Sequence, residues 1–95
     1  MLTSKQRAQL RSLSNDLDSI FQIGKGGISD EMLHQISNAL EARELIKISV
    51  LENCEFSAKE ASKIVAEATG SDAVSVVGRR FVLYRESKKN KRIIT

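Results

Sequence analysis

A short glycine-rich stretch carries the most distinctive chemistry in this sequence. Residues 21–29 read FQIGKGGIS, so three glycines and Lys25 stand between an apolar run and the expected start of a helix. Each glycine in an ordered backbone costs roughly 0.5–1 kcal/mol relative to alanine, because glycine is so flexible in the unfolded chain. The stretch therefore indicates either a contorted turn or a backbone that another molecule approaches closely.

The position of this stretch favours a phosphate as the guest. It joins an expected strand to an expected helix, and the first amides of a helix have no partner within it. Glycines keep side chains away from such amides, and the helix dipole favours an anion there. We therefore expect the amides of Gly26 and Gly27 to hold a phosphate, with Lys25 supplying charge. The alternative, a flexible connector capped by Ser29, stays open on the loop alone.

Enzyme classes that use similar loops do not fit. A Walker A loop needs Ser or Thr directly after its Gly-Lys, but Gly26 follows Lys25, and Ser19 stands where the earlier glycine belongs. The dinucleotide fingerprint needs Gly or Ala where this chain has Ser29. The only histidine, His34, and the only cysteine, Cys54, have no partners for a zinc site or a catalytic set. We expect no enzyme, no cofactor and no metal.

Positive charge is concentrated at the C-terminal end. Residues 79–95 hold seven basic residues and one acid, Glu86, a net +6, whereas the rest of the chain has 8 basic and 11 acidic residues, a net −3. A cationic sector predicts an anionic partner, nucleic acid first and an anionic membrane surface second. The candidates to contact it are Arg79, Arg80, Arg85, Lys88 and Lys89. Each alone is typical of a solvated turn or tail, but with the glycine loop they favour one electrostatic surface. Spacing alone does not show whether they share a face.

Hydrophobic periodicity and caps predict the elements that position these residues. They are a helix over 2–17, a strand over 19–24, a helix capped by Ser29 that continues to Glu44, a strand over 45–51, a helix capped by Ser57 that stops at Gly70, and two β-runs within 72–85 meeting at Gly78-Arg79-Arg80. The order is α-β-α-β-α-β-β. Helices between strands imply crossovers, so we predict a single compact two-layer α/β domain with a four-stranded mixed sheet.

The same patterns predict which side chains are buried. The expected core positions are Leu10, Leu13 and Leu17; Met32, Leu33, Ile36, Ala39 and Leu40; Ile46, Ile48 and Val50; and Ala61, Ile64, Val65 and Ala68. Of the last strand, Phe81 and Leu83 form one face and Val82 and Tyr84 the other, which points outward or into a second layer. The four aromatic residues are too few for a sheet platform that stacks bases.

Length and composition bound the rest. Ninety-five residues make one domain, 1–95, and the basic tail, 87–95, is expected to be mobile. No apolar run approaches the roughly 18 residues that span a bilayer, the first residues are polar, and one cysteine fits a reducing compartment. We expect a cytoplasmic protein without membrane or small-molecule partners.

Four stretches in this order resemble the CRM-domain family (chloroplast RNA splicing and ribosome maturation), in particular its stand-alone bacterial YhbY-type members. They are LTSKQRAQLRSL, IGKGGIS, ELIKISVL and VVGRRFVLYR with its basic tail. The resemblance implies a fold similar to the C-terminal domain of translation initiation factor three. It makes Gly24 and Gly27 the glycines of a GxxG loop and adds Lys5, Arg7 and Arg11 to the basic surface. It departs at Glu86, where relatives often have proline.

By that resemblance, the expected partner is RNA, specifically ribosomal RNA on large-subunit precursors. A KH domain has a similar loop between two helices, whereas here the loop joins a strand to a helix, so the likeness to KH domains is one of loop chemistry. We therefore predict a monomeric, non-enzymatic RNA-binding domain. Its alternative is a protein-interaction module docking on a ribosomal particle, with an incidental basic tail. DNA binding ranks third.

Overall fold

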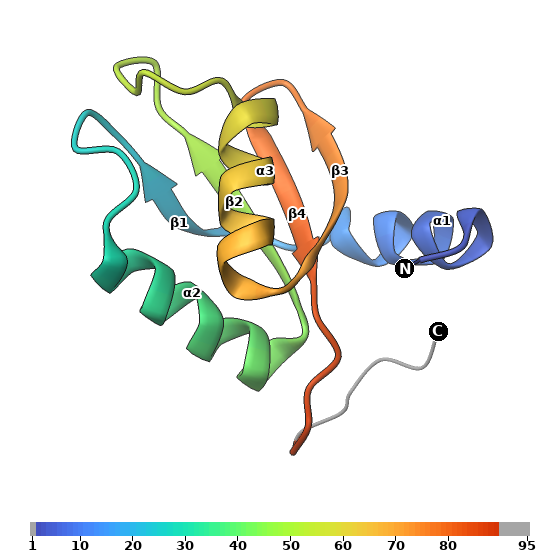
Figure 1. The fold of residues 1–95 in the computed structure, drawn as a ribbon. Coiled ribbons are helices and arrows are strands. Elements are labelled where there is room, and N and C mark those ends of the chain that lie inside the picture. The colour runs from blue at the N-terminus through green and yellow to red at the C-terminus, as the bar shows by residue number, and fades with distance from the viewer. Residues whose placement is uncertain (1, 90–95) are drawn as a thin grey trace.

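A computed structural model describes residues 2–89 of the chain and contains seven regular elements (Figure 1). In chain order they are α1 (Ser4–Ser14), β1 (Ser19–Ile23), α2 (Asp30–Arg43), β2 (Leu45–Val50), α3 (Ala58–Thr69), β3 (Asp72–Val77) and β4 (Arg80–Tyr84). The predicted order α-β-α-β-α-β-β is confirmed. The part of the expected mobile tail from residue 90 onward lies outside the described residues.

The four strands form one mixed sheet in the order β1-β2-β4-β3. β1 lies parallel to β2, with Ile23 beside Val50, because α2 carries the chain back across the sheet between them. β4 lies antiparallel to both β2 and β3. The predicted mixed sheet and the predicted hairpin are therefore confirmed. The C-terminal ends of β1 and β2 lie at the same end of the sheet as the β3–β4 turn. We call this the loop end of the sheet.

Helix caps set most of the boundaries. Thr3 with Gln6 and Ser57 with Glu60 form reciprocal capping boxes, and Gly70 ends α3 in the left-handed conformation. α1 stops at Ser14 rather than at residue 17. The Asn15 amide donates to Ser12 O and the Leu17 amide to Ser14 O, and short polar side chains here compete with helical hydrogen bonding.

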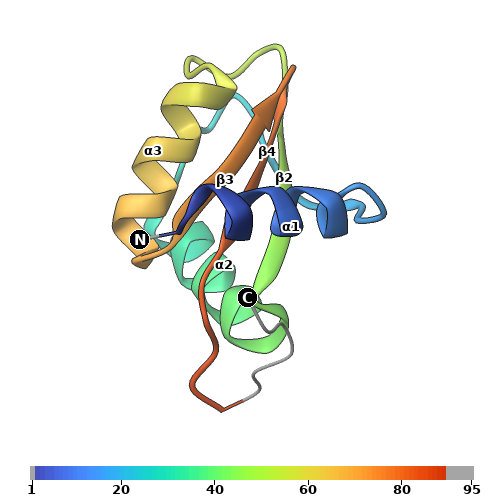
Figure 2. The same cartoon turned by 90° about the vertical axis from the view of Figure 1, so that its right-hand side faces the viewer.

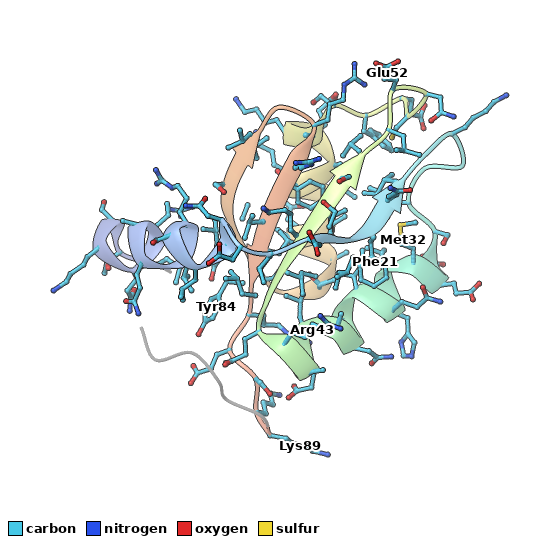
Figure 3. All side chains as sticks on the ribbon, turned by 180° about the vertical axis from the view of Figure 1, so that it is seen from behind. Phe21, Met32, Arg43, Glu52, Tyr84 and Lys89 are labelled. Atoms are coloured by element: carbon cyan, nitrogen blue, oxygen red, sulfur yellow. The ribbon has the colours of Figure 1, made fainter. Side chains whose placement is uncertain are left out.

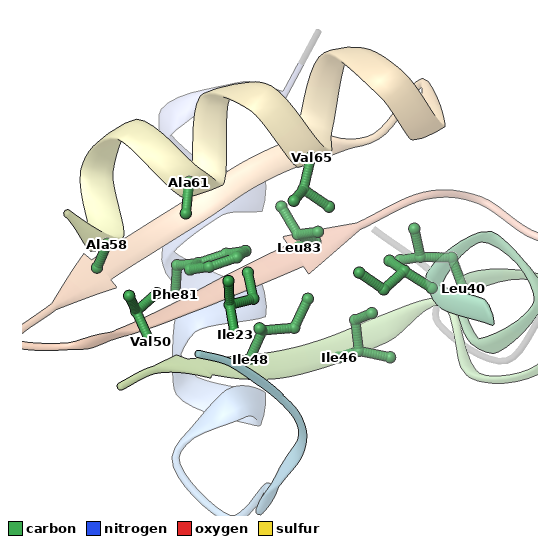
Figure 4. Close-up of a cluster of buried hydrophobic side chains, with 11 residues drawn as sticks. Ile23, Leu40, Ile46, Ile48, Val50, Ala58, Ala61, Val65, Phe81 and Leu83 are labelled. Carbon is green, nitrogen blue, oxygen red and sulfur yellow. The ribbon is translucent and has the colours of Figure 1, made fainter. Parts of the chain in front are cut away.

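The largest hydrophobic core lies between the sheet and the helix pair α2 and α3 (Figure 4). The sheet contributes Ile46, Ile48 and Val50 from β2 and Phe81 and Leu83 from β4, all buried as the alternation predicts. From α2 come Ile36 and Leu40, with Met32, Leu33 and Ala39 packed at the margin.

The buried side of α3 is rotated from the predicted one. Ala61 and Val65 face the core as expected, but Ile64 is 38% exposed and Ala68 is exposed, while Ser62 and Thr69 are buried. The two hydroxyls donate to carbonyls of their own helix, Ser62 to Lys59 O and Thr69 to Val65 O, both at 2.7 Å. Their burial is therefore satisfied, and the apolar pattern alone misplaced the interface.

A smaller core lies on the opposite face of the sheet under α1 (Figure 2). Leu10 packs there against Leu45, Val74, Val82 and Tyr84. The two-layer arrangement holds for the sheet with α2 and α3, but α1 adds a partial third layer. The prediction of three leucines on the first helix is wrong for Leu13, which is 46% exposed, because the short helix buries only one turn-to-turn stripe.

After β4, two glutamates of the α2–β2 junction hold the chain. The buried Glu44 has φ 66°; its carbonyl accepts from the Arg85 amide at 3.0 Å and its carboxylate from the Ser87 amide at 2.8 Å. The Glu41 carboxylate accepts from the Ser87 hydroxyl and from the amides of Lys88 and Lys89. These hydrogen bonds lower the pKa of Glu41 below its ordinary value of 4.5, and the bond from the Ser87 hydroxyl has the largest effect.

The Glu41 contacts predict an acid-sensitive attachment of residues 87–89. A lowered folded-state pKa stabilises the protein above the unfolded value of 4.5, and that contribution is lost as pH falls through the folded value. We expect the stability difference between wild type and Glu41→Gln to shrink below pH 4.5 and to be constant above about pH 6. Urea unfolding at a series of pH values measures it. A difference independent of pH would contradict the assignment.

Candidate nucleic-acid interface

The glycine loop at the loop end of the sheet is a closed turn. The Gly27 amide donates to Gly24 O at 3.0 Å, and Gly27 has φ 71°, a conformation that side chains disfavour. A Cβ at Gly24 would lie 3.3 Å from Leu51 Cδ1, which is tighter than ordinary contact. At Gly26 a Cβ would meet nothing within 4 Å, and its φ is not positive. The fold therefore explains Gly24 and Gly27 but not Gly26.

One of the two expected phosphate donors of the loop, the Gly27 amide, is already used within the fold. Because the Gly27 amide is used to close the turn, the two adjacent amides of Lys25 and Gly26 are the ones at the loop tip without a backbone acceptor among the described residues. The Lys25 side chain is exposed. At the start of α2, Ser29 Oγ accepts from the Met32 amide at 3.1 Å, and the acids Asp30 and Glu31 occupy the first turn. Their carboxylates oppose the attraction of an anion to this helix end, so Lys25 is the main cationic group of the loop.

The β3–β4 turn lies near the glycine loop, separated from it by the segment 51–57. Hydrogen bonds fix the ends of the neighbouring strands here: the Leu51 amide donates to Ile23 O at the end of β1 at 2.8 Å, and the Val50 amide at the end of β2 donates to Arg79 O of the turn at 2.7 Å. Arg79 forms an ion pair with Glu52 at 3.6 Å, in which both side chains are exposed. Such a pair contributes little stability, so Arg79 is available to exchange Glu52 for a phosphate.

The basic residues after β4 do not join this surface. β4 runs from the turn to the opposite end of the sheet, and Figure 3 shows Glu52 and Lys89 at opposite ends of the molecule. Lys88 and Lys89 have exposed side chains beyond that opposite end of the sheet. The expectation of one electrostatic surface formed by loop, turn and tail is therefore wrong for the described residues, because a strand separates them.

Arg85 is held inside the fold. Its guanidinium donates to Ser37 Oγ at 3.0 Å, to Ser37 O at 2.7 Å and to Thr69 O at 2.7 Å. It thus ties α2 to the C-terminal end of α3. An internal role explains this arginine without RNA.

The three basic residues of α1 have three different surroundings. Lys5 is exposed, whereas the Arg7 guanidinium donates to the carbonyls of Ala73 and Val74, where the register of β3 shifts. Arg11 is exposed and lines a hollow together with Arg80. Lys47 of β2 lines the same hollow. Because side chains alternate along β2, the buried Ile46 and Ile48 put Lys47 on the other face of the strand. Lys47 is not among the predicted site residues, because the sequence does not show where α1 lies.

Other site chemistries find little support in the described chain. Phe81 and Tyr84 are buried, so neither presents a ring for base stacking. No group of three or more His, Cys, Asp or Glu side chains within residues 2–89 is placed to hold a metal ion. Over the same residues, none of the helices has the length and apolar character that crossing a membrane requires.

Comparison with known proteins gives consistent matches over nearly the whole chain. The family model described as the CRS1 / YhbY (CRM) domain matches residues 2–85. The Bacillus subtilis protein named "Probable RNA-binding protein YqeI" is 50% identical over 93 residues, which cover 98% of this chain and 97% of that protein. A Haemophilus influenzae protein named "RNA-binding protein" is 30% identical, covering 95% and 91%.

A solved structure matches as well. The solution structure of SAV1595 from Staphylococcus aureus has a TM-score of 0.80 and 54% sequence identity, and the match covers 96% of this chain and 95% of that one.

Proposed function

The chain belongs to the CRS1 / YhbY (CRM) domain family, and we propose that it is an RNA-binding protein that contacts structured ribosomal RNA on precursors of the large ribosomal subunit. Two relatives with the RNA-binding name support the RNA part of the proposal. The ribosomal part rests on the resemblance to YhbY-type proteins. The protein acts as a cytoplasmic monomer without enzymatic activity; the single free cysteine, Cys54, is consistent with a reducing compartment.

The proposed contact is supported mainly by the glycine at position 26, which the fold itself does not require. Its neighbours in the loop are glycines for internal reasons, whereas Gly26 has open space beside it and no positive φ. A residue without a side chain at an open, exposed turn is useful where a sugar-phosphate backbone must come close to the main chain. The adjacent Lys25 supplies the charge that such a backbone attracts.

Binding would proceed through phosphates more than through bases. A phosphate seated on the amides of Lys25 and Gly26 would be neutralised by the Lys25 ammonium. A second phosphate would draw Arg79 away from Glu52, forming a bidentate contact that a guanidinium makes well. Contacts of this kind set position and carry little sequence information. Selectivity would therefore come from the shape of the folded RNA.

Salt-titrated binding to a structured fragment of large-subunit ribosomal RNA tests the proposal. A protein that neutralises about four phosphates shows a log–log slope of affinity against salt near −3, at about −0.7 per phosphate for single strands. Duplex DNA of equal length serves as the competitor, and we expect it to bind more weakly. Equal affinity for the duplex would favour DNA binding instead.

The alternative is a module that docks on a protein of a ribosomal particle. The side chain of Val77, 73% exposed beside the β3–β4 turn, is the observation in its favour. Such a module would show a shallow salt slope, and its association with particles would survive RNase treatment. Loss of association after RNase supports the RNA contact.

A further inference from the structure

A hollow of about 230 Å³ lies on the α1 face of the sheet, next to the C-terminal end of that helix. Three cations from three elements line it: Arg11 from α1, Lys47 from β2 and Arg80 from β4. Asn15 and Ser75 add neutral polar groups to its wall. We call this hollow the α1-face groove.

The cations of the α1-face groove form no ion pair within the described chain. No acidic residue among 2–89 lines the groove, and Arg11, Lys47 and Arg80 have neither an ion pair nor a side-chain hydrogen bond to any described residue. Arg7 and Arg85, by contrast, each donate to carbonyls of the fold. Like charges gathered in a shared hollow repel one another, so their placement is explained by an anion that enters it.

The sheet register keeps these side chains together. Val82 of β4 lies opposite Lys47 on β2 and opposite Ser75 on β3. Arg80 stands two residues before Val82 on β4 and so points to the same face. Neighbouring strands are about 4.8 Å apart and alternate residues share a face, so Lys47 and Arg80 stand on adjacent strands with their side chains on one side. The groove is thus positioned by rigid elements.

We propose that the α1-face groove is a second RNA contact, which binds the phosphodiester backbone of the same RNA that reaches the glycine loop. The inference rests on the proposed function. Two arginines and a lysine suit phosphate oxygens, and the hydroxyl and amide of Ser75 and Asn15 suit phosphate or ribose oxygens. The groove has no aromatic residue in its wall, so it holds backbone and does not stack bases.

The route from the groove to the glycine loop crosses three strands at the loop end of the sheet. Arg80 lies opposite Ser49, and Ser49 lies opposite Gln22 on β1, two residues before Gly24. The path crosses two strand spacings, about 10 Å, before it reaches the loop. On the other side of Lys47 a neighbouring hollow is lined by Asp16 and Asp18 together with Arg43 and Lys47, so its charged groups balance and it has no net charge to attract a polyanion. A single RNA strand therefore reaches from groove to loop along the loop end of the sheet.

The test compares an Arg11→Gln/Lys47→Gln variant with wild type in salt-titrated binding to the ribosomal RNA fragment. Losing two phosphate contacts makes the log–log slope shallower by about 1.4. The matched control is Lys59→Gln/Lys63→Gln, which removes the same charge from exposed positions of α3 on the opposite face. Circular dichroism verifies folding. Arg11→Gln alone, at an exposed helical position, keeps the test valid if the double variant is unstable, with an expected change of about 0.7.

The outcomes separate the groove from the loop. A shallower slope in the groove variant but not in the α3 control supports the inference. A groove variant that matches wild type, while a glycine-loop variant loses affinity, overturns the groove and leaves the proposed function intact. Loss in the groove variant with an unaffected loop variant supports the groove and overturns the loop contact. A wild-type protein without salt-sensitive RNA affinity overturns both.

Discussion

A Lys25→Asp/Gly26→Asp variant is expected to lose about 100-fold in affinity for structured ribosomal RNA at moderate salt, since one favourable charge contact is replaced by two repulsive ones at about 1 kcal/mol each. The salt slope becomes shallower at the same time. The fold should tolerate both changes. Lys25 is exposed, and a side chain at Gly26 enters open space without a positive φ.

The control for this variant is a Lys63→Glu/Ala68→Glu protein. It changes the net charge by the same amount, but at exposed positions of α3 away from the loop end. Near wild-type affinity in the control, with loss in the loop variant, assigns the effect to the site instead of to overall charge. If the folded loop variant bound RNA like wild type, the loop would be only a connector between β1 and α2.

An Arg85→Gln variant is expected to lose about 2–3 kcal/mol of unfolding free energy, because it removes three hydrogen bonds from a charged donor and leaves two carbonyl acceptors without their partner. The acceptors are the carbonyls of Ser37 and Thr69 together with the Ser37 hydroxyl. Urea unfolding measures the loss. The substitution should have little effect on the RNA affinity of the folded protein, since the Arg85 guanidinium is hydrogen-bonded to α2 and α3.

Lys88→Gln is the matched control for Arg85. It also removes one positive charge near the C-terminal end of β4, but its side chain is exposed, so we expect stability within about 0.5 kcal/mol of wild type. An Arg85→Gln protein as stable as wild type but weaker in RNA binding would restore Arg85 to the RNA surface.

Local patterns in the sequence were sufficient for much of the fold. The capping pairs Thr3 with Gln6 and Ser57 with Glu60 mark helix starts that the structure confirms. Strict alternation in β2 identified its core face, and Gly78 marked the hairpin. These features depend on residues within a few positions of one another, so the sequence displays them directly. The same locality made the glycine loop recognisable as a strand-to-helix turn.

Long-range packing decided which basic residues share a surface. Arg7 and Arg85 look like exposed cations in the sequence, but each donates to carbonyls that are more than ten residues away. Arg11, Lys47 and Arg80 come together only because α1 docks on the face opposite α2 and α3. Periodicity gives the apolar side of a helix but not the sheet face it covers.

The sequence by itself therefore determined the elements, their order and the loop that can approach a phosphate. The tertiary structure decided which glycine is free of a structural task, which arginines are used internally and where cations gather. The physical reason is that caps and alternation are short-range, whereas unpaired carbonyls, close approaches and shared hollows arise only when distant segments pack together.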